Sequence, residues 1–90
     1  MNKIRRRRID ALSDRVAGLQ ASMEELLEEL EQIRDEEQEA FDNIPESLEG
    51  SERYNAAEAA IEDLDSAYEN LEGARDMLED VLSGLSGAAE

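Results

Sequence analysis

The chain has 90 residues and a formal charge of −16, and it contains neither cysteine nor histidine. The absence of these residue types removes disulfides, thiolate or imidazole metal sites and the usual nucleophile and base pairs. Aromatic residues make up only 3% of the chain, too few for a base-stacking platform or a deep aromatic pocket. We therefore expect one small domain that is not an enzyme and binds no cofactor.

The N-terminal segment is basic, and we call it the basic arm: Lys3, Arg5, Arg6, Arg7 and Arg8. No apolar run of about 20 residues follows it, so we expect a soluble cytoplasmic protein that does not bind membranes. Two interpretations of the arm stay open. It could contact nucleic-acid phosphates, or it could lie against the end of a second helix, near Glu79 and Asp80, where the helix dipole is negative.

Residues from about 3 to 41 predict one long helix, because apolar side chains recur with the seven-residue spacing of a coiled coil, written abcdefg. Position a is held by Ile9, Val16, Met23 and Leu30, and position d by Leu12, Leu19, Leu26 and Ile33. Most acidic residues of this segment fall outside a and d. They should face solvent when a and d face another helix.

A connector of about residues 42–51 should reverse the chain. Asn43 and Pro45 predict the cap and first turn of a short helix. Three apolar residues with helical spacing should cover the end of the helix pair: Phe41, Ile44 and Leu48. Gly50 marks a second break, and Ser51 is the expected cap of the next helix.

A second long helix is predicted from about 52 to 83, ended by Gly84, with a frayed tail over 84–90. Its a and d positions are apolar except at Arg75, and they are held by Tyr54, Ala57, Ile61, Leu64, Tyr68, Leu71, Leu78, Leu82 and Leu85. Position g carries a further stripe of small residues: Ala60, Ala67, Ala74 and Val81. This stripe widens the apolar face beyond what one partner helix covers.

The short connection favours an all-α fold, an antiparallel two-helix coiled-coil hairpin in one domain. The wide apolar face favours dimerisation of two hairpins into a four-helix bundle, while a parallel dimer through the first helix stays open. In the expected hairpin, Arg75 faces the region of Asp14 and Val16. Gly18 and Gly73 lie level with each other, as either a tolerated weak point or a narrow docking site.

The rest of the surface is strongly acidic, since residues 9–90 hold 4 basic against 25 acidic residues, a balance of −21. On a rod of roughly 50 Å this is about one carboxylate per 2 Å, close to the ~1.7 Å per charge of duplex DNA. We expect ten acids to bind a basic partner surface: Glu24, Glu25, Glu28, Glu31, Asp35, Glu36, Glu39, Glu46, Glu49 and Glu52. The partner class is a nucleic-acid-binding protein, for which the rod would act as a nucleic-acid mimic.

The stretch EEQEAFDNIPESLEGSERY, with NKIRRRRIDALSDR before it and AIEDLDSAYENLEGA after it, resembles a group of short acidic helical proteins of phages, prophages and other bacterial mobile elements. The resemblance covers most of the chain and implies no catalytic residue, ligand or named partner. It implies a setting in which small acidic proteins block host nucleic-acid-handling machinery, including restriction and CRISPR systems, in the cytoplasm of a bacterium or of a phage host.

Two other functions stay open. The helices could be a purely structural assembly element, in which case the apolar residues matter and the acids only keep the rod in solution. Alternatively, the basic arm could make the protein a nucleic-acid-binding regulator. The charge of −21 on the remaining chain repels phosphates and disfavours direct nucleic-acid binding.

Overall fold

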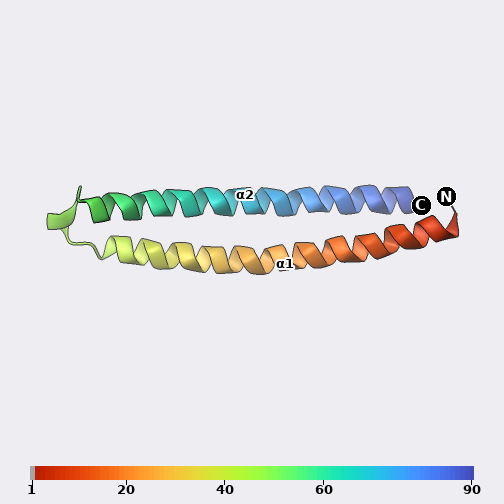
Figure 1. The fold of residues 1–90 in the computed structure, drawn as a ribbon, viewed down its shortest axis with the longest axis horizontal. Helices are drawn as coiled ribbons and strands as arrows, with labels where there is room; N and C mark the ends of the chain where they lie inside the picture. The colour runs from red at the N-terminus through yellow and green to blue at the C-terminus, as the bar shows by residue number, and fades with distance from the viewer. Residues whose placement is uncertain (1) are drawn as a thin grey trace.

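The computed structural model describes residues 2–90, which form two long helices joined by a short one. Helix α1 spans Lys3–Asp42, the 3₁₀ helix η1 spans Glu46–Leu48, and α2 spans Glu52–Ala89. The two long helices run side by side in opposite directions, and both termini lie at one end of the rod (Figure 1). The rod measures 70 × 15 × 13 Å. The predicted all-α helical hairpin is confirmed.

Both long helices begin at a side-chain cap. The Asn2 Oδ1 atom accepts a hydrogen bond from the Arg5 backbone N–H at 2.8 Å. The Ser51 Oγ atom accepts one from the Tyr54 backbone N–H at 3.2 Å, as the sequence predicted. Each cap satisfies one of the free N–H groups at a helix start.

The connector differs from the prediction at Asn43. This residue ends α1, because its backbone N–H donates to the Glu39 carbonyl oxygen at 3.1 Å and so closes the last helical turn. Pro45 precedes η1, and no side chain caps that short helix. Gly50 then adopts a φ of +80°, a conformation that glycine reaches without steric cost and that turns the chain into α2.

The C-terminal end of α2 lies beyond the predicted one, since the helix continues through Gly84 to Ala89. Leu82, Leu85 and Ala89 are half-buried, so this last segment still packs against α1. Packing of this kind outweighs the weak helix propensity of glycine. The predicted frayed tail over 84–90 is therefore wrong.

The contact between the two helices follows the predicted positions on α2, where the apolar a and d residues are half-buried or buried. On α1 it uses position a together with position e. The e residues of α1 that face α2 are Ser13, Gln20, Leu27, Arg34 and Phe41, all half-buried or buried. Leu27 is 3% exposed and Ile61 is 8% exposed, which makes them the core of the described chain.

The d residues of α1 do not face α2. Leu12, Leu19, Leu26 and Ile33 are 44 to 55% exposed. The expectation that they join the contact within the hairpin is wrong, because α2 packs against positions a and e of α1, and one neighbouring helix cannot also bury position d. An apolar stripe therefore runs along the outside of α1.

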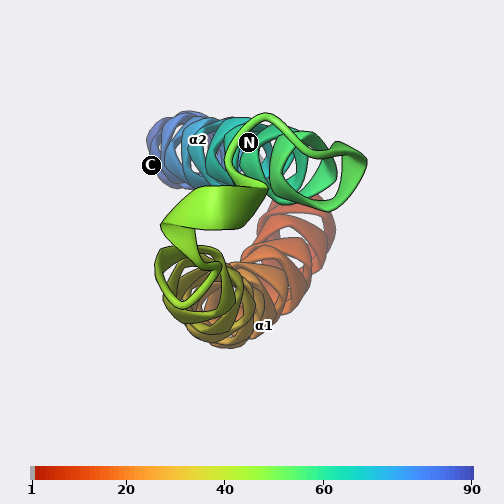
Figure 2. The same cartoon turned by 90° about the vertical axis from the view of Figure 1, so that its left-hand side faces the viewer.

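The helices wind gently around each other along the rod, as the end-on view shows (Figure 2). Such winding keeps a seven-residue contact pattern facing the partner over many turns, because 3.6 residues per turn drift from a seven-residue repeat.

Within residues 2–90, neither helix contains a stretch long and apolar enough to span a bilayer.

Candidate interaction surfaces

One long edge of the hairpin is closed by polar contacts between the helices. Three side-chain hydrogen bonds form it: Gln20 Nε2 to Glu79 Oε2 at 2.7 Å, Arg34 Nε to Asp65 Oδ1 at 2.8 Å, and Arg75 Nη1 to Glu24 Oε1 at 2.9 Å. The hydrogen bond that Arg34 donates to Asp65 raises the pKa of its guanidinium, and the hydrogen bonds that Arg75 donates to Asp76 and Glu24 raise the pKa of Arg75. These polar contacts close this edge of the hairpin within the chain.

These contacts also correct the predicted register. Arg75 pairs with Glu24 and not with the region of Asp14 and Val16. Since Gln20 meets Glu79, Gly18 lies level with residues near 80, so the predicted placement of Gly18 level with Gly73 is wrong. At the closed end, the rings of Phe41 and Tyr54 pack with centroids 4.7 Å apart.

The apolar cover at the end of the helix pair is smaller than predicted. Phe41 and Ile44 are half-buried at the closed end, where Phe41 packs on Tyr54. Leu48 is 41% exposed and does not complete the cover. It lies in η1, whose short 3₁₀ turn presents it to solvent.

The opposite long edge is apolar. Because the e residues of both helices meet on the polar edge, helix geometry places the d stripe of α1 and the g stripe of α2 together on the other one. Val81 and Ala67 are exposed there, while Ala60 and Ala74 are half-buried. We call this edge the lateral apolar face: Leu12, Leu19, Leu26 and Ile33 of α1 with Ala60, Ala67, Ala74 and Val81 of α2.

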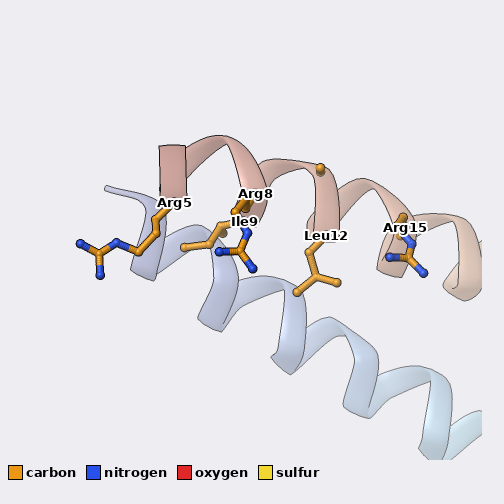
Figure 3. Close-up of a pocket in the computed structure, with 6 residues that line it drawn as sticks. Arg5, Arg8, Ile9, Leu12 and Arg15 are labelled. Atoms are coloured by element: carbon orange, nitrogen blue, oxygen red, sulfur yellow. The ribbon is translucent and has the colours of Figure 1, made fainter. Parts of the chain in front are cut away.

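The N-terminal end of α1 carries a basic hollow of about 500 Å³. The guanidinium groups of Arg5, Arg8 and Arg15 lie around Ile9 and Leu12 there (Figure 3). In the part of the chain that the structure describes, no carboxylate lies within ion-pair distance of any residue of the basic arm or of Arg15. These cations are free to meet another molecule.

The prediction that the basic arm meets Glu79 and Asp80 is wrong. Glu79 accepts its hydrogen bond from Gln20, more than three helical turns beyond the arm. The register places the arm at the open end of the rod, where α1 extends past α2 (Figure 1). The observed register is the physical reason, because it shifts α2 toward the closed end relative to the predicted pairing.

The C-terminal half of α1 carries an acidic surface. Its lining residues are Glu25, Glu28, Glu29, Glu31, Gln32, Asp35, Glu36 and Glu39. Six of the ten predicted acids belong to this acidic surface. Of the others, Glu24 pairs with Arg75, and Glu46, Glu49 and Glu52 lie exposed at the closed end of the rod. Sequence reasoning left out Glu29, although its spacing of seven residues from Glu36 places both at position g.

The charge density of one chain is lower than predicted from sequence. The 25 carboxylates are spread over 70 Å, or one per 2.8 Å. The sequence had predicted a shorter rod of roughly 50 Å, with about one carboxylate per 2 Å. Duplex DNA carries one charge per ~1.7 Å.

Within residues 2–90, no group of three or more carboxylates is arranged to hold a metal ion.

Comparison of the chain with protein-family models, with curated proteins and with solved structures finds no match. The resemblance to acidic helical proteins of phages and mobile elements stays a prediction that rests on the sequence segments quoted above.

Proposed function

We propose that the protein is a non-enzymatic protein–protein interaction module that binds a basic surface of a partner through the acidic surface of α1. The observation that carries this proposal is the exposure of those carboxylates along one helix, with Arg34 the single cation among them. Arg34 is already engaged by Asp65 at 2.8 Å. The acidic surface thus keeps its negative potential and attracts a cationic partner over about a Debye length.

The proposed working form is a homodimeric four-helix bundle in the cytoplasm. Two fully overlapping rods carry twice 25 carboxylates over 70 Å, or one per 1.4 Å. This value is close to the ~1.7 Å of duplex DNA, whereas that of the single chain is not. The dimer would therefore act as a nucleic-acid mimic that occupies the groove of a nucleic-acid-binding enzyme, as an inhibitor of host defence in a phage or mobile-element setting.

Affinity capture of the tagged protein from its native cell tests this function. We expect recovery of a nucleic-acid-binding enzyme in a low-salt wash and its loss in a high-salt wash, because salt screens exposed charges. The triple variant Glu28→Lys, Asp35→Lys and Glu39→Lys should recover none.

The matched control places the same three charge reversals on α2, at the exposed residues Glu58, Glu62 and Glu69. It has the same net charge as the triple variant of α1 and should retain the partner. Retention of the enzyme by the α1 variant would contradict the proposal.

A second candidate function is favoured by the exposure of the lateral apolar face. If the protein is only an assembly element, Leu26→Asp with Leu64→Asp should abolish its function, and surface charge reversals should have no effect. A third candidate rests on the free cations of the basic arm. A gel shift at low salt that retains neither DNA nor RNA would remove it.

A further inference from the structure

The lateral apolar face has a charged border along α1, and the sign of the charge changes from one end of this border to the other. Along α1, position g borders the d stripe on its outer side, and it is held in order by Arg8, Arg15, Ser22, Glu29 and Glu36. All five side chains are exposed, and none of the four charged ones has an ion-pair partner within residues 2–90. The border of the apolar stripe is thus basic toward the N-terminus and acidic toward the C-terminus.

We propose that a second copy of this chain covers the lateral apolar face, with the two α1 helices antiparallel and the connectors at opposite ends of the bundle. This inference rests on the proposed homodimer and adds its surface, its orientation and its charge pairs. Each Arg8 would meet Glu36 of the second copy, and each Arg15 would meet Glu29. A twofold axis repeats both pairs, so four cross-chain pairs form.

The centre of the apolar stripe supports this orientation. The midpoint of the four d residues falls between Ser22 and Met23, as does the midpoint of α1 itself. A twofold axis at this point sets Leu19 on Leu26 and Leu12 on Ile33 of the other copy. The same axis lets the two rods overlap along the whole of α1, so every apolar residue of the stripe finds an apolar partner.

Two other arrangements lack this complementarity. With parallel α1 helices, Arg8 would face Arg8 and Glu36 would face Glu36, which is repulsive. With the connectors at the same end, α1 would lie on α2 of the second copy. In the observed register Arg15 would then lie level with Gly84 and meet no carboxylate, while Glu36 would lie level with Asp63, which is repulsive. Only the antiparallel pairing of α1 with α1 satisfies both the apolar stripe and its charged border.

The size of the face fits a stable dimer. Helix α1 has 40 residues and is ~60 Å long, so a strip ~10 Å wide covers on the order of 600 Å². The stripe of α2 on the same edge, with Val81 at 45% exposure, adds to this area. Specific dimers bury about 800 Å² per partner. Two hairpins that meet face to face reach this range.

Charge reversal tests the orientation by sedimentation equilibrium at low salt. The first variant is Arg8→Glu with Arg15→Glu, and the second is Glu29→Arg with Glu36→Arg. Each turns four attractive pairs into repulsive ones, and we expect the dimer dissociation constant to rise about 100-fold. An equimolar mixture of the two variants should form a heterodimer as tightly as the unchanged chain, and so should the homodimer of the chain that carries all four changes.

The second variant also separates a specific pairing from general repulsion. It changes the net charge from −16 to −12, which by itself should strengthen self-association. The matched control, Glu28→Arg with Asp35→Arg, has the same net charge of −12 and the same seven-residue spacing, but its changes lie at position f away from the face. We expect the control to dimerise at least as well as the unchanged chain.

The outcomes separate this inference from the proposed function. If the unchanged chain dimerises and both charge variants dimerise equally well, the antiparallel orientation is wrong while the homodimer stands. If the unchanged chain is monomeric at every accessible concentration, the homodimer and its orientation both fall. Circular dichroism of each variant checks that the helices are retained, because none of the changed residues is buried in the hairpin.

Discussion

At the residue scale, two adjacent leucines of α1 have opposite environments. Leu27 is 3% exposed and lies in the contact with α2, whereas its neighbour Leu26 is 52% exposed on the lateral apolar face. The seven-residue repeat assigned Leu26 to the helix contact and left Leu27 aside. The structure reverses the two, because the polar edge draws the e residues of α1 toward α2.

Substitution to alanine should therefore separate the two leucines. Leu27→Ala should lower the free energy of unfolding by about 2 to 3 kcal/mol at any protein concentration, because it leaves a cavity in the core of the hairpin. Leu26→Ala should have little effect in dilute solution and a clear effect at high concentration, where the second copy buries it. Chemical denaturation at two protein concentrations measures both, and equal losses for both variants in dilute solution would contradict the assigned contact.

At the same scale, Arg75 is the polar interruption of the apolar a and d positions of α2. Its side chain is 24% exposed, and it reaches Glu24 at 2.9 Å and Asp76 at 3.2 Å. Polar residues at such positions fix the register at a cost in stability. We expect Arg75→Leu to raise the thermal midpoint, and a lower midpoint would show that the Arg75 pairs stabilise more than an apolar side chain would.

At the element scale, both long helices and their antiparallel order could be predicted from the apolar spacing and from the Gly50–Ser51 break. The end of α2 could not. Gly84 and Gly87 are local stop signals, and the packing of Leu85 and Ala89 against α1 overrides them. The register was also beyond local reasoning, because it is set by contacts between residues far apart in the chain, such as Gln20 with Glu79.

Alanine substitutions of two glycines should have opposite effects on stability. Gly50→Ala should lower the free energy of unfolding by about 1 kcal/mol, since φ is +80° there and alanine is strained in that region. Gly84→Ala should raise it by up to about 1 kcal/mol, because the residue is helical and nothing lies within 4 Å of an added Cβ atom. Thermal unfolding followed by circular dichroism compares the two, and the same sign for both would contradict the assigned backbone conformations.

At the scale of the whole molecule, the hairpin has two unlike long edges. The polar edge is closed within the chain by Gln20, Arg34 and Arg75, and the lateral apolar face is left open. The sequence predicted the acidic residues as a group, because their exposure follows from composition and spacing. It could not predict which apolar stripe stays uncovered, because that depends on how α1 is rotated about its own axis against α2.

The rotation of α1 links the fold to the proposed function. It turns the d stripe and its charged border toward a second copy, and it leaves Glu28, Asp35 and Glu39 outside that contact and available to a basic partner. Glu29 and Glu36 of the acidic surface then pair with the second copy, and its other carboxylates remain for a basic partner. Dimerisation and partner binding can be removed separately by the two sets of charge reversals described above.

The most direct test of the central claim is the mass of the protein in solution, measured by sedimentation equilibrium for the unchanged chain and for Leu19→Asp with Leu26→Asp. The unchanged chain should sediment as a dimer of twice 10.1 kDa. The variant should sediment as a helical monomer, because both changed residues lie on the lateral apolar face and outside the contact with α2. A monomeric unchanged chain, or a variant that still dimerises, would contradict the assignment of this face to a second copy.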